Sequence, residues 1–282
     1  QFQVAAGKPL PRRQDDLNIN GHAIEVRIYA ENPAKKFLPA SGLIRTLRAP
    51  TENAHVRIDT GVREGDAVTP FYDPMIAKLI VWDIDRDSAL RRLRASLAEY
   101  RILGPVNNIE FLAAIAAHPA FANGEVDTGF IERHRSDLFP EARPASDKIL
   151  VIACLDVLLH RARQAASASE ASSDLHSPWH HSNAWRLNAD NRHIITFGDG
   201  GTVVSITAHV RNGEYVLDLP SGPMTVRGEL DAAGDLAIDL DGARSKAMVA
   251  RHDEELTIIW AGVSHRLTMN PVSRAEDTYV AP

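Results

Sequence analysis

The chain has 282 residues, of which 44% are hydrophobic and 24% are charged, enough for one large or two ordinary hydrophobic cores. Its formal net charge of -6 gives no footprint for nucleic acid or for an anionic membrane surface. The single cysteine excludes an internal disulfide framework, and no apolar run approaches the roughly 20 residues of a membrane span. We therefore expect a cytoplasmic protein that binds neither nucleic acid nor membrane.

The segment 21–29 predicts a β-strand that carries one arginine on its polar face. Aliphatic and polar side chains alternate along it, in the order Ile24, Glu25, Val26, Arg27, Ile28 and Tyr29. A period of two separates the two kinds onto opposite faces. Arg27 stays charged at any working pH and offers a planar fork of donors, which suits a carboxylate, an oxyanion or a developing enolate. The residues alone leave open the commoner case, an arginine on a solvated sheet face.

The rest of the first half predicts further strands. Short strands are expected at 42–48 and 54–59. A nearly continuous apolar run over 71–82 predicts a central strand that is buried on both faces. Lys78 interrupts that run.

Helices are expected after these strands. Leucines at helical spacing predict a helix over 87–101. A second helix is expected to begin at Asn107, because Glu110 three residues later completes a capping pattern. Residues 129–139 predict a short amphipathic helix that ends the first half.

The second half predicts a helix enclosed by strands. Ser146 can cap a helix whose apolar residues from 149 to 159 leave almost no polar face, so protein has to surround it. Alternating runs punctuated by turn glycines predict strands at 185–188, 192–197, 202–210, 214–219, 224–230, 236–241, 246–251, 255–260 and 263–269. The economical fold is an antiparallel barrel around the helix, with Leu155 and Leu158 inside.

The connection between helix and barrel offers no strong chemical signal. Residues 164–177 are rich in alanine and serine and are expected to be mobile. His176, His180 and His181 lack an acidic or thiolate partner at ligand spacing, so a polar loop is favoured and no metal site is predicted. Cys154 is expected to be a core residue of the helix.

Two tryptophans in this connection suggest a contact surface. Trp179 and Trp185 lie among polar side chains, the mixture of aromatic anchor and polar rim that interfaces favour. The alternative is that both fold back to close the barrel end, chiefly Trp185, which begins a predicted strand.

Three sequence words in the first half resemble a known family. HAIEVRIYAENP at 22–33, FLPASG at 37–42 and VTPFYDPMIAKLIVW at 68–82 are similar to the C-terminal subdomain of biotin carboxylase, the ATP-grasp component of biotin-dependent carboxylases. The resemblance implies an α+β fold for residues 1–140, with a mixed sheet and helices. It also implies that Arg27 lies against the ureido ring of biotin and stabilises its enolate during carboxylation.

The same resemblance implies secondary site residues. Tyr72, Asp73 and Lys78 would border the biotin pocket. Their residue types also fit a turn tyrosine, an Asp-Pro turn and a lysine whose stem lies along apolar surface, and the sequence leaves these alternatives open.

Residues 141–282 resemble the barrel domain that joins biotin carboxylase to the biotin carrier in acyl-CoA carboxylase alpha subunits. The word SPWHHSNAWRLN at 177–188 favours the methylcrotonyl-CoA or geranyl-CoA branch. We expect methylcrotonyl-CoA carboxylase, and hence leucine catabolism, with propionyl-CoA, geranyl-CoA and acetyl-CoA carboxylases as alternatives. The resemblance implies a hetero-oligomer in which the barrel binds a carboxyltransferase beta subunit. A non-catalytic scaffold is the competing class.

The resemblance also implies that the chain is a fragment. Gln1 is not an initiator methionine. The ligands of ATP and Mg²⁺ would lie before it, and the carrier domain that bears biotin would follow the chain. We therefore expect that the fragment is inactive alone.

Overall fold

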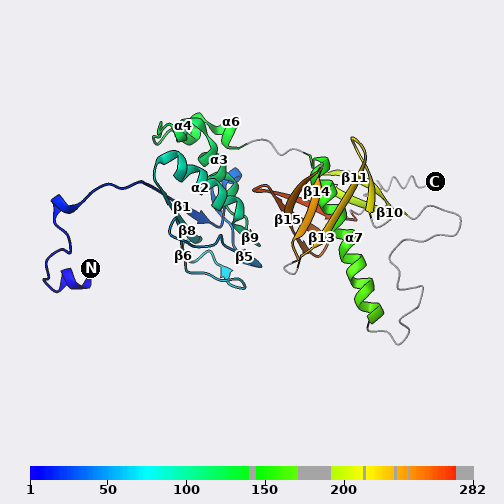
Figure 1. Ribbon diagram of the computed structural model, residues 1–282, viewed down its shortest axis with the longest axis horizontal. Coiled ribbons are helices and arrows are strands. Elements are labelled where there is room, and N and C mark those ends of the chain that lie inside the picture. The colour runs from blue at the N-terminus through cyan, green and yellow to red at the C-terminus, as the bar shows by residue number, and fades with distance from the viewer. Residues whose placement is uncertain (140–143, 171–191, 212–213, 232–233, 241, 271–282) are drawn as a thin grey trace, which may run out of the picture. The chain divides into compact units, whose positions relative to one another are not determined.

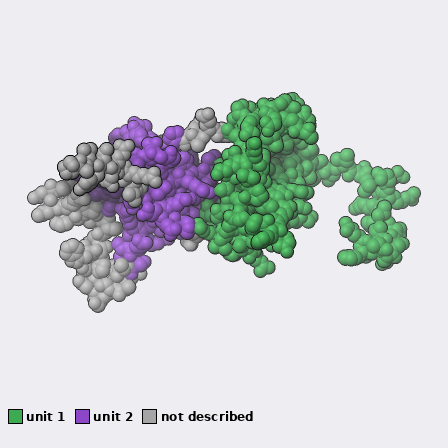
Figure 2. All heavy atoms as spheres, turned by 180° about the vertical axis from the view of Figure 1, so that it is seen from behind, with its two compact units in different colours: residues 1–139 green, residues 140–282 purple. Residues whose placement is uncertain are grey.

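The computed structural model describes residues 1–139, 144–170, 192–211, 214–231, 234–240 and 242–270. The chain divides into two compact units, residues 1–139 and residues 140–282 (Figure 2). Each unit has its own hydrophobic core.

The first unit is built on a three-stranded antiparallel sheet in the order β1–β8–β6 (Figure 1). Its strands are β1 His22–Tyr29, β8 Met75–Asp83 and β6 Val56–Thr60. The alternation predicted for β1 is present, because Ile24 and Ile28 are buried while Arg27 is exposed.

Strand β8 is central, as predicted, but two-sided burial of this strand is wrong. Ala77, Leu79 and Val81 are buried, whereas Lys78 and Ile80 are only half-buried. Ala77, Leu79 and Val81 face the helices, whereas Lys78 and Ile80 lie on the opposite face of the sheet, with the polar side chains of β1. That opposite face is only half-buried, although the sequence of β8 is apolar along most of its length.

Helix α2, Arg86–Glu99, packs against β1 and β8. It begins at Asp85, whose carboxylate accepts a hydrogen bond from the Ser88 amide at 2.7 Å. One core cluster contains the helix leucines and their β8 neighbours, Leu90, Leu93, Leu97, Leu79 and Val81. Each buried leucine stabilises the unit by about 1.5–3 kcal/mol relative to an exposed one.

The later helices differ from the prediction in their bounds. Helix α3, Ile109–Ala117, follows Asn108 rather than Asn107. Asn107 still accepts a hydrogen bond from the Ile109 amide at 3.2 Å. Helix α4 is Pro119–Ala122. The single helix predicted over 129–139 is wrong, because the chain breaks at His134 into α5 Phe130–Arg133 and α6 Arg135–Leu138.

The strand predicted over 42–48 is also two short strands with different partners. The smaller elements of the unit are α1 Phe2–Ala5, η1 Gln14–Asp16, β2 Glu31–Asn32, η2 Pro33–Lys35, β3 Leu38–Pro39, β4 Gly42–Leu43, β5 Thr46–Arg48, β7 Ala67–Val68 and β9 Arg101–Leu103. Strand β4 pairs with β7, and β5 pairs with β9. Gly104, at φ +127°, lies so close to the end of β4 that a Cβ there would overlap the Leu43 carbonyl oxygen.

The second unit is a closed antiparallel barrel around a helix (Figure 1). Its strands are β10 Arg192–Asp199, β11 Thr202–Arg211, β12 Glu214–Leu219, β13 Gly222–Leu230, β14 Leu236–Leu240, β15 Ala243–His252, β16 Glu255–Trp260 and β17 Val263–Met269. The predicted architecture, an α+β unit followed by this barrel, is confirmed. The strand predicted at 185–188 lies outside the described residues.

Helix α7, Asp147–Glu170, fills the barrel. Leu155 and Leu158 are buried in one cluster with wall residues such as Phe197. Gly228 on β13 lets the wall come close, since a Cβ there would lie 3.2 Å from Leu155 Cδ1. The prediction of a mobile connection is wrong for residues 164–170, because alanine, glutamine and glutamate are strong helix formers and continue α7 to Glu170. No helix among the described residues is long and apolar enough to cross a membrane.

Candidate functional site

Arg27 lies on the exposed face of β1 between two polar neighbours. Its Nε donates to Glu25 Oε1 at 3.4 Å, and the Arg27 side chain is 57% exposed. Hydrogen bonds from the guanidinium to the Tyr29 and Glu25 side chains raise the pKa of Arg27 above its ordinary value. The site therefore holds a permanent and accessible positive charge.

Lys78 lies directly opposite Arg27 on β8 and opposite Asp59 on β6. Two cations at such a cross-strand position repel each other. Asp59 does not compensate Lys78, because Arg57 binds both of its carboxylate oxygens, at 2.8 and 3.0 Å. Within the part of the chain that the structure describes, Lys78 has no hydrogen-bond or ion-pair partner. This arrangement suits an anion on the sheet face.

Asp73 is connected to this face through Tyr29. The Tyr29 hydroxyl lies 3.5 Å from Asp73 Oδ2, and Asp73 Oδ1 accepts from the Met75 amide at 3.1 Å. Tyr72 is 84% exposed, and no hydrogen bond joins it to Arg27. Of the residues singled out from the sequence, the structure thus places Arg27 opposite Lys78, connects Asp73 to Tyr29 and leaves Tyr72 exposed.

The backbone beneath Arg27 is held by a residue that the sequence pattern did not single out for the site. Asn108 is buried, and its Oδ1 accepts from the Tyr29 amide at 2.9 Å. Its Nδ2 donates to the Arg27 carbonyl at 3.2 Å and to Glu31 Oε1 at 3.0 Å. Burial raises the pKa of Glu31, which this hydrogen bond opposes. The sequence pattern indicated only a helix start, at the neighbouring Asn107.

A second polar group lies inside the barrel. Asp156 on α7 is fully buried, and its Oδ2 accepts from Arg251 Nε at 2.8 Å and Nη2 at 2.5 Å. His160 Nδ1 lies 3.1 Å from the other carboxylate oxygen, Oδ1. Burial raises the pKa of Asp156, against the opposing effect of Arg251 and His160. The apolar pattern predicted for this helix gave no sign of the ion pair.

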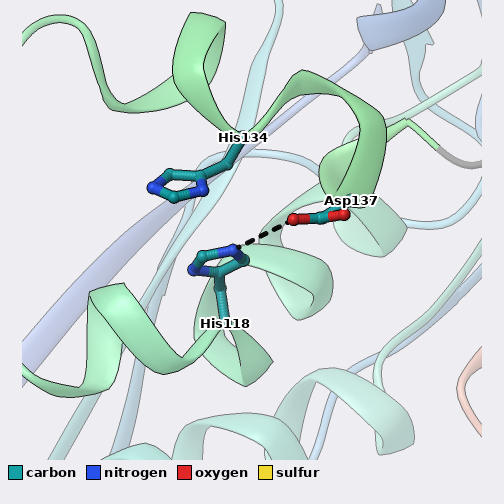
Figure 3. Close-up of side chains that lie close together, drawn as sticks. All are labelled: His118, His134 and Asp137. Carbon is teal, nitrogen blue, oxygen red and sulfur yellow. Dashed lines mark ion pairs between the residues drawn. The ribbon is translucent and has the colours of Figure 1, made fainter.

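His118, His134 and Asp137 form the third cluster (Figure 3). Nδ1 of His118 accepts from the Ala120 amide at 3.2 Å, so the proton of the neutral ring is on Nε2. That Nε2 faces Asp137 Oδ2 at 3.5 Å. A metal ion bound to Nε2 would require the ring proton to be on Nδ1. That proton would then face the Ala120 N–H, and two donors would oppose each other. The cluster therefore fits a cap of helix α4 better than a metal site.

Of the remaining candidates, only Cys154 lies among the residues that the structure describes. Cys154 is fully buried, and burial raises the pKa of its thiol, so the prediction of an inert core cysteine agrees with its position. Five candidates lie outside the described residues, namely His176, Trp179, His180, His181 and Trp185.

Comparison with known families identifies both units. Residues 25–133 match the model of the biotin carboxylase C-terminal domain. Residues 146–272 match that of the BT domain of the methylcrotonyl-CoA carboxylase alpha-subunit. The chain therefore consists of a biotin carboxylase C-terminal domain followed by a BT domain, the two domains of the family predicted from the sequence words, and that prediction is confirmed. It is similar to methylcrotonoyl-CoA carboxylase alpha subunits.

Curated relatives agree with this assignment. The mitochondrial methylcrotonoyl-CoA carboxylase subunit alpha of Dictyostelium discoideum is 44% identical over 208 residues, covering 73% of this chain and 29% of that protein. The corresponding subunit of Rattus norvegicus is 34% identical over 288 residues, covering 99% of this chain and 40% of that protein. The biotin carboxylase subunit of pyruvate carboxylase, a solved structure, is 38% identical with a TM-score of 0.48, over 50% of this chain and 31% of that chain. The chain thus spans well under half the length of these relatives.

Proposed function

We propose that the chain is part of the alpha subunit of an acyl-CoA carboxylase of the methylcrotonyl-CoA type, a ligase that acts in leucine catabolism. In this proposal the first unit contributes to the ATP- and bicarbonate-dependent carboxylation of biotin. The observation that carries it is the pair of facing cations, Arg27 and Lys78, on a sheet face of a biotin carboxylase domain. The repulsion between them is relieved when an anion or a developing negative charge lies between them.

Arg27 has the chemistry for the principal role. Biotin, when bound, supplies a ureido ring whose oxygen gains negative charge as the ring nitrogen becomes nucleophilic. The guanidinium of Arg27 offers a rigid fork of donors to that oxygen and stays charged throughout. Lys78 adds a second positive charge from the neighbouring strand, and Asp73 limits how far Tyr29 can move. Tyr72 is proposed to contact biotin at the exposed edge of the site.

The other components are assigned by proposal to the rest of the parent subunit. The chain spans 29% to 40% of the alpha-subunit relatives described above. We expect the ATP and Mg²⁺ ligands, and the carrier domain that bears biotin, in the length that it does not span. The chain alone is then inactive. A cytoplasmic location stays a prediction, and the names of the curated relatives place those proteins in mitochondria.

The barrel is proposed to bind the carboxyltransferase beta subunit in a hetero-oligomer. Helix α7 occupies the barrel interior, which leaves the outer wall and the loops for contact. The carboxylate of Asp156 is fully buried and paired with Arg251 through Oδ2, so it is not accessible for catalysis. Trp179 and Trp185 are the proposed anchors of this interface.

Substrate choice tests the proposed function. The full-length alpha subunit is co-expressed with its beta subunit, and incorporation of labelled bicarbonate is measured with four acyl-CoA substrates. We expect the highest kcat/KM with 3-methylcrotonyl-CoA. A higher value with propionyl-CoA, acetyl-CoA or geranyl-CoA would change the assigned substrate. Absence of carboxylation with all four would favour a non-catalytic scaffold.

A further inference from the structure

Arg27 and Arg57 lie on two strands of one sheet, yet their environments differ. Asp59 binds Arg57 in a bidentate pair, which occupies two guanidinium donors. Among the described residues, the geometry gives Arg27 one polar contact, at 3.4 Å with Glu25, and the Tyr29 side chain contributes to its raised pKa. Most of its donors are therefore left for a ligand, but a long and exposed side chain with so few contacts needs something to orient it.

The backbone at Tyr29 is irregular in a way that re-aims its side chain. The register with β8 runs regularly to Ile28 opposite Ala77 and then shifts, so that Tyr29 is opposite Met75 and Ile76 is skipped. Such a bulge breaks the ladder and turns a side chain away from its regular direction. The Tyr29 amide is satisfied by the buried Asn108 side chain at 2.9 Å. The irregularity is thus supported by a second buried group.

The re-aimed hydroxyl lies between a cation and a carboxylate. Tyr29 Oη is 3.5 Å from Asp73 Oδ2, and Tyr29 follows Arg27 by two residues on β1, where its side chain makes the largest contribution to the raised pKa of Arg27. Asp73 is itself fixed by the Met75 amide at 3.1 Å. A phenol that donates to Asp73 still has oxygen lone pairs with which it can accept from Arg27. It therefore orients the guanidinium without the bidentate pairing that removes Arg57 from use.

We propose that Tyr29, held by Asp73, is the positioning residue that aims Arg27 at the oxygen on which negative charge develops. This inference rests on the proposed function and adds a residue to it. Removal of the hydroxyl leaves the charge of Arg27 intact but frees the guanidinium to adopt other rotamers. The loss falls on the transition state, because an oriented donor matters most where charge develops.

The test uses the full-length alpha subunit with free biotin as substrate. Tyr29→Phe removes only the hydroxyl, and we expect kcat to fall about tenfold, the size of one hydrogen bond to a charged group, with a smaller change in KM for biotin. Asp73→Asn should lower kcat in the same direction. The matched control is Tyr100→Phe, because the buried Tyr100 hydroxyl has no hydrogen-bond partner in the described part of the chain. Its kcat should equal that of the wild type.

A double-mutant cycle separates positioning from general structural damage. In an Arg27→Ala background, Tyr29→Phe should have no further effect on kcat, because the group that it aims is absent. If the fold-losses in kcat of Tyr29→Phe and Arg27→Ala multiply in the double variant, the positioning role is wrong. The same holds if Tyr29→Phe is as fast as Tyr100→Phe while Arg27→Ala is slow, and both outcomes leave the proposed function standing. An Arg27→Ala enzyme with the wild-type rate would instead overturn the proposed function.

Discussion

The electrostatic repulsion between Arg27 and Lys78 indicates where a negatively charged ligand could bind. They face each other across an antiparallel strand pair, where like charges repel each other. The nearby carboxylates leave Lys78 without an ion-pair partner among the described residues, because Glu25 pairs with Arg27, Asp59 pairs with Arg57 and Asp73 contacts Tyr29. An anionic group on the sheet face offsets the repulsion, which is the physical basis of the proposed site.

Asp156 gives a pH-dependent prediction. Burial raises its pKa in the folded state above the unfolded value of about 3.9. A raised pKa favours the protonated form, so the stability from this group is fully present below the unfolded pKa and is lost as pH rises through the folded pKa. Relative to Asp156→Asn, which cannot ionise, the wild type should therefore lose unfolding free energy as pH rises above about 4.

Urea unfolding of both proteins from pH 4 to pH 8 measures this difference. Opposite behaviour, in which the wild type gains stability over Asp156→Asn as pH rises, would mean that attraction to Arg251 exceeds the cost of burial.

At the residue scale the sequence allowed some roles to be predicted and hid others. Strand alternation placed Arg27 and Tyr29 on one face, because a period of two is a local property. The side-chain partners of Asn108 are 77 to 81 residues away, and those of Asp156 include Arg251 at a separation of 95. No local pattern encodes such pairings, since they depend on how distant elements pack.

The central element of the second unit is α7, and Leu155 tests its placement. Leu155→Asp puts an unpaired charge against the barrel wall near Gly228 and should destabilise the unit by more than about 3 kcal/mol. The thermal transition of the second unit should disappear while that of the first remains. Arg161→Asp, at an exposed position on the same helix, is the control and should melt like the wild type. Two unchanged transitions in Leu155→Asp would contradict an enclosed helix.

Elements were predicted best where pattern and turn chemistry agree. Glycine turns separate the barrel strands, and three of them, β12, β16 and β17, have the predicted bounds. The first-unit errors have tertiary causes. The close approach of Gly104 divides the strand expected over 42–48, and the chain breaks at His134 where His118 and Asp137 gather.

At the scale of the whole molecule, assembly with a beta subunit is the main expectation. If Trp179 is an interface anchor, Trp179→Ala should weaken association by about 2 kcal/mol or more. Carboxylation of biotin by the alpha subunit should be unchanged. Analytical ultracentrifugation of the two subunits over a concentration series measures the Kd.

A wild-type Kd for this variant would remove Trp179 from the interface. An alpha subunit without the barrel that still assembles would contradict the docking role itself.

The most direct test of the central claim is the rate of free-biotin carboxylation by the full-length alpha subunit carrying Arg27→Ala. Loss of one preorganised donor should slow the reaction by about 10²- to 10³-fold, with folding retained. Arg27→Lys should restore only part of the rate, because an ammonium lacks the guanidinium fork. Arg94→Ala, which removes an exposed arginine from α2, should leave the rate unchanged. An Arg27→Ala enzyme that carboxylates biotin at the wild-type rate would contradict the account.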